Sequence, residues 1–451
     1  LIMMIKTLIV RRLRIISIVK CFRNMKTNIK INQLVVFLNL LLFTIFACKK
    51  NPTIPKLTTE AVSGITQTSA VSGGVVIDDG GIPIINRGLC WGTSQNPDTS
   101  NSKTIEKGST GFFSSRLTSL ISGTLYYVRA YATNEAGTGY GGQVSFTTDP
   151  VVLPDVLTDQ TTSVTSNSAI AGGIIASDGG AELLECGVCW GTSPEPTIQG
   201  QHIPCSSCSG EFVCNLEELE EATLYYVRAY AVNESGTAYG DELSFRTLLS
   251  DIEGSLYETI VIGTQVWMAE NLKTTRYSDN EEISLVTDNQ EWSELLTPGY
   301  CWYDNDDTEN RSTYGALYNW YAINTGKLCP SGWHIPTDAE WSQLIDFLGG
   351  EIVAGGKLKK TGTDLWASPN KDATGESGFS AVPAGVRHDT YIPVNNYGVF
   401  EGLRLSAWFT AFNEASSTFA YWLTLNYTSG EAVLRDSAPK NIGFSVRCLK
   451  D

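Results

Sequence analysis

Five cysteines in the middle of the chain have types and spacing that suit a metal site or a disulfide cluster. Two Cys-x2-Cys pairs lie fifteen residues apart, a spacing typical of four-thiolate zinc centres: Cys186, Cys189, Cys205 and Cys208. A further thiol, Cys214, follows closely. In an oxidising compartment the same thiols form disulfides.

An internal repeat favours disulfides over zinc. Cys189 corresponds to Cys90 in an earlier copy of the same segment, where Cys90 precedes Trp91 without neighbouring thiols. Cys186 and Cys189 also differ by three along an expected strand, so their side chains should face opposite sides. We therefore predict that Cys189 is a small buried thiol. Disulfides should form among the other four residues, Cys186, Cys205, Cys208 and Cys214.

An acidic run is the second candidate for metal binding. Asp304, Asp306, Asp307 and Glu309 stand in the sequence YDNDDTEN. Oxygen ligands at this density suit Ca²⁺, but the run lacks the glycine and the distal glutamate of an EF-hand loop. We expect a solvated acidic loop and no cofactor, with a calcium site at Asp304, Asp306 and Asp307 as the alternative.

Catalytic motifs are absent from the sequence. The chain has three histidines, His202, His334 and His388, and no HExxH, glycine-rich phosphate loop or G-x-S-x-G. His334 lies just before an expected helix, which favours a structural role. Acids are numerous enough for hydrolysis by paired carboxylates, but no spacing marks a pair. We predict no catalytic residues and a protein that is not an enzyme.

The clearest helix is expected after Pro336. Thr337 and Glu340 form a capping box, and Gly349-Gly350 provides a C-terminal stop. One face carries apolar residues at helical spacing: Trp341, Leu344, Ile345 and Leu348. A shorter apolar run predicts a preceding helix: Leu317, Trp320 and Tyr321. Cys329 lies in the turn between the two helices and should hold them together.

Residues 57–148 and 152–248 are two copies of one segment. TLYYVRAYATNEAGTGYG at 124–141 recurs as TLYYVRAYAVNESGTAYG at 223–240, a constant offset of 99 residues. Alternating apolar and polar side chains predict strands with one buried face. The LISGTLYYVRAYA stretch resembles the fibronectin type III family, which implies tyrosine corners at Tyr126 and Tyr225. We expect two antiparallel sandwiches that act as spacers, with a ligand-binding pair as the alternative.

The N-terminal residues have the pattern of a secretion signal. Residues 25–47 have a basic start and an apolar stretch too short to span a bilayer comfortably. Ile45 to Cys48 resembles a bacterial lipobox, which implies acylation of Cys48, with an uncleaved membrane anchor as the alternative. We expect residues 1–24 to be an upstream extension of the gene start and residues 48–56 to be a linker. Lys49 and Lys50 depart from the acidic signal typical of surface lipoproteins of Bacteroidetes.

The charge excludes nucleic acid as a partner. The formal net charge is −16, and without residues 1–47 only 24 basic residues stand against 48 acidic ones. Such a surface repels phosphate backbones. Frequent glycine and aromatic residues with few charges suit β-rich extracellular modules.

Residues 251–451 contain the motifs CWYDND, YGALYNWYA, KLCPSGWHIPTDAEW, ESGFSAVPAG and a final GFSVRC. With these motifs the segment resembles the Fibrobacter succinogenes major paralogous domain. HIPTDAEW and GFSVRC also resemble the formylglycine-generating enzyme and C-type-lectin-like group, which implies an α+β fold. That resemblance further implies a Cys329–Cys448 disulfide, with Cys301 unpaired or competing for Cys329. The reactive cysteine pair of the enzyme has no counterpart beside Cys448.

The expected architecture is therefore multidomain, with two all-β fibronectin type III-like sandwiches followed by an α+β C-type-lectin-like domain. We predict a lipid-anchored outer-membrane protein whose terminal domain binds a glycan or protein without catalysis. The alternatives are an enzyme of the formylglycine-generating or polysaccharide-active kind and a purely structural envelope component. In family members, a Trp-Ser-Ser-Thr stretch stands where this chain has Ala407 to Ala411, so a ligand bound there should differ.

Overall fold

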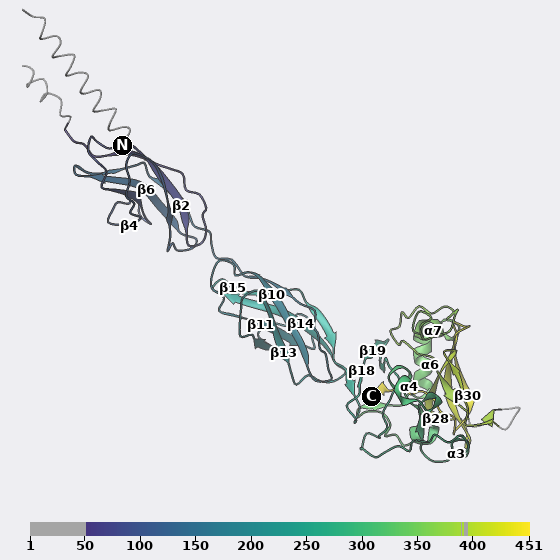
Figure 1. Cartoon of the computed structure of the whole chain (residues 1–451). Coiled ribbons are helices and arrows are strands. Elements are labelled where there is room, and N and C mark those ends of the chain that lie inside the picture. Colours follow the sequence, from purple (N-terminus) through teal and green to yellow (C-terminus); the bar gives the residue numbers. More distant parts are fainter. Residues whose placement is uncertain (1–50, 389, 392–395) are drawn as a thin grey trace, which may run out of the picture. The chain divides into compact units, whose positions relative to one another are not determined.

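The structure is a computed structural model that describes residues 51–388, 390–391 and 396–451. The expected lipid site, Cys48, and the whole N-terminal secretion signal lie outside the described residues. The chain divides into two compact units, the first ending at Pro150 and the second beginning at Val151. Among the described residues, none of the helices has the length and apolar character needed to cross a membrane. Most of the regular structure is β-sheet (Figure 1).

The first unit contains a sandwich of two antiparallel sheets. One sheet has the order β1 (Lys56–Thr59), β2 (Ala70–Asp78), β5 (Gly111–Leu117). The other has the order β4 (Ser102–Lys103), β3 (Asn86–Gly92), β6 (Leu125–Asn134), β7 (Gly137–Tyr140), and β8 (Val144–Thr147) also pairs with β6.

The second sandwich repeats this topology strand for strand. One sheet has the order β13 (Glu211–Leu216), β10 (Ala169–Ser177), β9 (Asp155–Thr158). The other has the order β12 (Gln201–Pro204), β11 (Glu185–Gly191), β14 (Leu224–Asn233), β15 (Gly236–Tyr239), and β16 (Leu243–Arg246) also pairs with β14. The constant sequence offset thus corresponds to one fold used twice.

Each sandwich has a tyrosine hydroxyl that accepts a backbone hydrogen bond from five residues upstream. The N–H of Ile121 donates to the Tyr126 hydroxyl at 3.0 Å, and the N–H of Glu220 donates to the Tyr225 hydroxyl at 2.9 Å. Both rings are buried and stack on a phenylalanine of the neighbouring strand. This is the geometry of a tyrosine corner, which ties the loop before the strand to the core.

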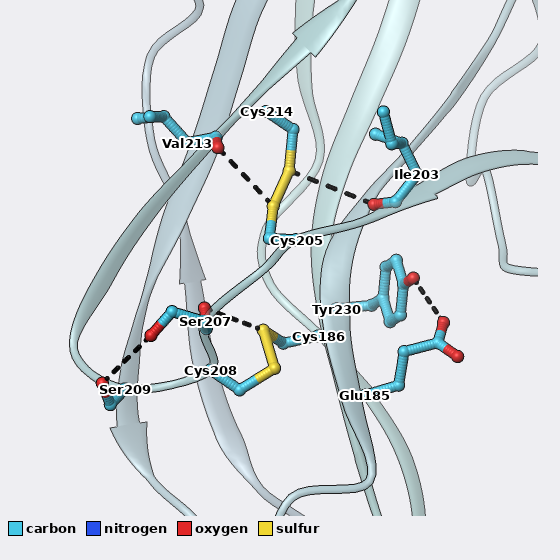
Figure 2. The surroundings of a disulfide bond; sticks show 10 residues. All are labelled: Glu185, Cys186, Ile203, Cys205, Ser207, Cys208, Ser209, Val213, Cys214 and Tyr230. Atoms are coloured by element: carbon cyan, nitrogen blue, oxygen red, sulfur yellow. Dashed lines mark hydrogen bonds between the residues drawn. A yellow bond between two sulfur atoms is a disulfide. The ribbon is translucent and has the colours of Figure 1, made fainter.

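The two sandwiches connect the same four positions by different chemistry. In the second, Cys186 bonds Cys208 and Cys205 bonds Cys214, with Cα separations of 5.5 and 6.1 Å (Figure 2). In the first, the residues 99 positions earlier are polar: Arg87, Ser109, Glu106 and Ser115. There the Arg87 guanidinium donates to the Ser109 carbonyl at 2.7 Å. The Ser115 hydroxyl donates to the Glu106 carboxylate. Disulfides therefore replace hydrogen bonds in the second copy.

These disulfides use three of the four thiols with zinc spacing, Cys186, Cys205 and Cys208, together with Cys214. Cys189 is buried without a disulfide, and its thiol donates to the Pro196 carbonyl at 3.3 Å, as that of Cys90 does to Pro97 at 3.4 Å. Burial raises the pKa of both thiols to about 11. Because the other three thiols with zinc spacing are in disulfides, Cys189 cannot complete a four-thiolate site.

The terminal domain is a mixture of short sheets and helices. Its strands are β17 (Leu249–Ser250), β18 (Leu256–Tyr257), β19 (Thr259–Ile262), β20 (Gln265–Met268), β21 (Tyr300–Cys301), β22 (Leu317–Tyr318), β23 (Trp333–His334), β24 (Ala384–Arg387), β25 (Thr390–Tyr391), β26 (Asn396–Tyr397), β27 (Phe400–Leu403), β28 (Ser406–Glu414), β29 (Phe419–Asn426), β30 (Ala432–Pro439) and β31 (Leu449–Lys450). Its helices are α3 (Asn289–Glu294), the 3-10 turn η1 (Tyr303–Asn305), α4 (Asp307–Tyr314), α5 (Trp320–Ile323), α6 (Asp338–Phe347) and α7 (Glu351–Leu358).

Two sheets organise this domain. The larger has the order β27-β24-β28-β29-β30 and is antiparallel except between β24 and β28, while the smaller has the order β19-β20-β31-β23. Figure 1 shows α6 and α7 beside the strands of the larger sheet. The buried face of α6 forms one core cluster with β28 and β29, in which the rings of Trp341 and Trp267 lie 4.7 Å apart. The smaller sheet and α5 border a second cluster, which includes Cys329 and Cys448.

Helix α6 begins with the expected capping box. The N–H of Glu340 donates to the Thr337 hydroxyl at 3.3 Å, and the N–H of Thr337 donates back to the Glu340 carboxylate at 2.8 Å. The preceding helix is shorter than expected, because Leu317 lies in strand β22 and only Trp320–Ile323 is helical. A second helix, α7, follows Gly349-Gly350 directly, a continuation that the glycine stop did not predict.

Cys329 bonds Cys448, with a Cα separation of 5.9 Å, and Cys301 is a buried free thiol. The bond fastens the turn before β23 to the strand segment that leads into β31, so it does not link α5 to α6. The alternative pairing of Cys301 with Cys329 is not formed.

His334 connects the start of α6 to the end of β31, and this contact predicts a pH dependence. Burial opposes protonation, but hydrogen bonds to Asp451 (2.6 Å) and Glu340 (3.1 Å) raise the pKa of His334 above its ordinary value of 6.5. A raised pKa stabilises the fold fully below pH 6.5, and this contribution is lost as pH rises through the folded-state value. We expect a contribution below about 1 kcal/mol, because the ring is partly exposed.

Calorimetry across this pH range tests the prediction. As pH rises from about 6 to about 8, the range in which histidine titrates, the terminal-domain melting temperature of the wild type should fall relative to that of His334→Gln. A constant difference between the two proteins over that range would contradict it. His202→Gln, on the second sandwich, provides a matched control.

Candidate functional site

A polar cleft in the terminal domain is the strongest candidate for a functional site. It has a volume of about 400 Å³, within the range of small-ligand sites. Its walls come from the segment after β20, the end of α4, the segment after α7 and the C-terminal segment. The charged and hydroxyl residues that line it are Glu258, Glu270, Ser312, Thr313, Lys360, Ser380 and Arg447.

Arg447 forms the floor of the cleft and is fully buried. Its Nε donates to Asn271 Oδ1 at 2.9 Å, Nη2 donates to the Ser380 carbonyl at 3.1 Å, and Nη1 donates to the Phe379 carbonyl. The guanidinium carbon lies 4.3 Å from the centre of the Phe379 ring. Burial lowers the pKa of this guanidinium to about 9, and the Glu270 carboxylate opposes the shift. The floor of the cleft therefore remains cationic at neutral pH.

The residues around Arg447 are held in place by the backbone. Asn271 Nδ2 donates to the Tyr314 carbonyl at 2.8 Å and to Ser445 Oγ at 3.2 Å, so the amide that orients Arg447 is itself fixed. Gly315 follows α4 with φ of 74°, and a Cβ there would lie 2.7 Å from the Leu272 carbonyl oxygen. A glycine at this position lets the chain turn tightly against the cleft wall.

Two carboxylates face the same cleft. The Glu258 N–H donates to Glu270 Oε1 at 3.2 Å, and Glu270 also pairs with Lys273 at 3.6 Å. Lys360 is exposed at the rim. Opposite charges and hydroxyls thus converge on one hollow, which suits a polar ligand that both donates and accepts hydrogen bonds.

The acidic run expected as a loop forms the start of α4 instead. Asp306 is the N-cap and accepts from the N–H groups of Thr308 and Glu309 at 2.9 and 3.2 Å. Hydrogen bonds from Thr308 lower the pKa of Asp306, whereas burial raises that of Asp304. Asp307 opens the helix. Across the described ranges, no group of three or more His, Cys, Asp or Glu side chains is arranged to hold a metal ion.

The tryptophans of the terminal domain are mostly core residues. Seven of the nine are buried, and the two that are partly exposed, Trp408 and Trp422, stack on each other with ring centres 4.1 Å apart. Phe444 packs against both at 6.3 and 6.4 Å. One face of each of these two rings is therefore covered by the other ring. The stretch Ala407 to Ala411 lies in β28.

One feature of the sequence points to the cleft. Arg447 is a charged residue inside an otherwise uncharged, buried run, Phe444 to Leu449. A charge in such a run is expected to have a specific set of partners. Asn271 and Lys360 carried no such signal, because nothing in their local sequence distinguishes them from surface residues.

No curated protein matches the sequence. The solved structure titled "Crystal structure of chicken CNTN1 FN1-FN3 domains" is 14% identical in sequence to this chain. The match covers 44% of this chain and 69% of the solved chain. Its TM-score of 0.20 is too low to establish a shared fold. Residues 260–450, which hold all of the polar cleft except Glu258, match the family model of the Fibrobacter succinogenes major domain.

Proposed function

We propose that this chain is an exported recognition protein whose terminal domain binds a glycan or protein ligand in the polar cleft. The supporting observation is the cleft itself, where a buried guanidinium, two carboxylates and several hydroxyls converge. Disulfides in two places and a mostly β architecture are typical of extracellular proteins. The match to a Fibrobacter succinogenes major domain agrees with a surface or adhesion role.

In this proposal the terminal domain is C-type-lectin-like and the two sandwiches are spacers. The anchor is an acyl group on Cys48 that attaches the protein to the outer membrane. Labelling cells with a radioactive fatty acid tests the anchor: the wild type should incorporate label and Cys48→Ser should not. Equal labelling of the two proteins would refute the lipid anchor but would not bear on ligand binding in the cleft.

Binding assays with the full chain test the cleft. Screens of glycan arrays and of envelope, host and plant polymers should yield at least one ligand. The double variant Glu258→Gln with Lys360→Gln should bind that ligand about tenfold or more weakly, because it loses about one hydrogen-bonded charge contact. Both residues are exposed, so the variants should fold. Glu294→Gln, on exposed α3 and outside the cleft, is the matched control. Equal affinity in all three proteins would exclude the cleft.

A second candidate function is polysaccharide hydrolysis. The observation in its favour is that Glu258 and Glu270 line one cleft, as the paired carboxylates of glycoside hydrolases do. Turnover of a polysaccharide by the wild type, lost in Glu258→Gln while binding persists, would establish it. Ligand binding without turnover would support the non-catalytic proposal.

A further inference from the structure

The segment 247–251 joins the second sandwich to the terminal domain and is hydrogen-bonded to both. Domains of one chain are expected to move relative to each other unless contacts at their junction prevent it. On the sandwich side, the Thr247 hydroxyl donates to the Glu220 carbonyl at 2.6 Å. The next N–H, that of Leu248, donates to the Thr165 carbonyl at 2.9 Å. On the other side, β17 pairs with β18 of the terminal domain, so both ends of the segment are fixed.

Asp251 holds the turn that follows β17. Its carboxylate accepts from the Tyr257 hydroxyl at 2.6 Å. It also accepts from the N–H groups of Glu253 and Ser255 at 3.0 and 2.9 Å. Asp251 and Tyr257 are both buried, so water does not compete for these bonds. The path of the chain into the terminal domain is therefore defined by side-chain contacts as well as by strand pairing.

The loop between β13 and β14 of the sandwich contributes to the core of the terminal domain. Ala222 is 1% exposed and belongs to the same core cluster as Leu249 and Tyr257. Its backbone is left-handed, with φ of 48°, a conformation that costs energy for a residue with a Cβ. The residue 99 positions earlier is Gly123, with φ of 58°. The second sandwich thus keeps a methyl group where the backbone suits glycine, and this methyl group packs in the terminal-domain core.

A polar contact accompanies this methyl group. The Glu221 carboxylate accepts from the N–H and the hydroxyl of Ser250 at 3.3 and 3.1 Å. The residues 99 positions earlier are Ser122, which has no carboxylate, and Val151, which has no hydroxyl. Because the two sandwiches share one topology, the fold itself does not require either contact. Both contacts therefore serve the junction with the terminal domain.

The same junction leads to the wall of the polar cleft. Tyr257 precedes Glu258, whose N–H donates to the Glu270 carboxylate at 3.2 Å. The Tyr257 hydroxyl accepts from the Lys273 N–H at 3.1 Å. The Nζ of Lys273 lies 4.8 Å from the centre of the Tyr257 ring and 3.6 Å from the Glu270 carboxylate. The two carboxylates of the cleft are thus connected to the tyrosine that fixes the junction.

We propose that the second sandwich and the terminal domain form one rigid body, in which the junction sets the direction that the cleft faces. The second sandwich is then a spacer that cannot bend at its C-terminal end. This rigidity does not depend on what the cleft binds, so a failure to find a ligand would leave it standing.

Distances between spin labels on the full chain test this rigidity. One label replaces Asn215, exposed on β13, and the other replaces Glu294, exposed on α3. Both are attached to p-acetylphenylalanine through its ketone, which leaves every cysteine unmodified. Double electron–electron resonance on the otherwise wild-type chain should give a single narrow distance distribution. A broad distribution would overturn the proposal.

The double variant Glu221→Ser with Ala222→Gly gives this junction the residues of the first sandwich. Glycine suits the left-handed backbone, so the sandwich should fold, and its melting temperature checks that it does. The distance distribution should widen and lose its single maximum, because the methyl group and the Ser250 contact are both gone. Glu218→Gly is the matched control: Glu218 has φ of 57° in the same loop but is exposed. An unchanged distribution in the double variant, or equal widening in the control, would contradict the proposal.

Discussion

Replacing Arg387 with methionine should lower the free energy of unfolding of the terminal domain by about 3–5 kcal/mol, the cost of breaking a buried charged network. The guanidinium is fully buried and makes five hydrogen bonds. Its acceptors are the carbonyls of Gly398, Val286, Thr287 and Asp288 and the side chain of Asn289, at 2.6–3.1 Å. It also lies 4.7 Å from the ring centres of Trp292 and Phe400.

The physical reason is that methionine fills a similar volume but donates no hydrogen bond. The Gly398 and Val286 carbonyls would then be buried without partners, each at a cost of about 1–3 kcal/mol. The carbonyls of Thr287 and Asp288 also accept from Asn305 Nδ2 and from the Trp292 N–H, so they would keep a partner. Chemical denaturation of the full chain, followed by tryptophan fluorescence, should show the terminal-domain transition at lower denaturant.

Arg404→Met is the matched control. Arg404 also donates to two backbone carbonyls, those of Asp364 (2.7 Å) and Thr363 (3.1 Å), but it is exposed, so water can replace it. Its loss should cost less than about 1 kcal/mol. Equal losses for the two variants would show that burial of Arg387 does not contribute as argued.

Replacing Cys329 and Cys448 together with alanine should cost the terminal domain up to about 4–5 kcal/mol. The bond joins residues 119 positions apart, and without it the unfolded chain gains the entropy of a long open loop. Both half-cystines are buried in one core cluster, so the alanines also leave small cavities. Calorimetry under non-reducing conditions should show the terminal-domain transition at a lower temperature.

Removing the Cys205–Cys214 bond provides a comparison for the stability lost without the Cys329–Cys448 bond. The Cys205–Cys214 bond closes a loop of only 9 residues in the second sandwich. The same entropy argument gives roughly 2.5 kcal/mol for removing it, about half of the larger effect. If the Cys329/Cys448 double variant melted with the wild type, or if peptide mapping of the unreduced protein separated these two cysteines, the argument would fail.

Local sequence was sufficient for features whose partners lie nearby or in the other copy. The capping box of Thr337 and Glu340 spans three residues, so its hydrogen bonds were predictable from spacing alone. The repeat exposed Cys189 as a match to Cys90 and left the four remaining thiols for disulfides. The resemblance of the C-terminal segment to C-type-lectin-like proteins implied the Cys329–Cys448 pair. In the first two cases the pattern itself contains the contact, whereas the family resemblance supplied the third, between residues 119 positions apart.

Tertiary structure decided the features whose partners are distant and unrelated in sequence. Arg447 and Asn271 are 176 residues apart, and no local pattern brings them together over the cleft. Leu317 joined a strand because its hydrogen-bonding partner, Cys301, lies in a separate segment. Trp408 and Trp422 stack on each other because they lie on the neighbouring strands β28 and β29. Sequence spacing therefore determined the short-range hydrogen bonds and the repeat. Long-range packing determined which polar groups converge, because desolvation and ring contacts depend on neighbours that only folding brings together.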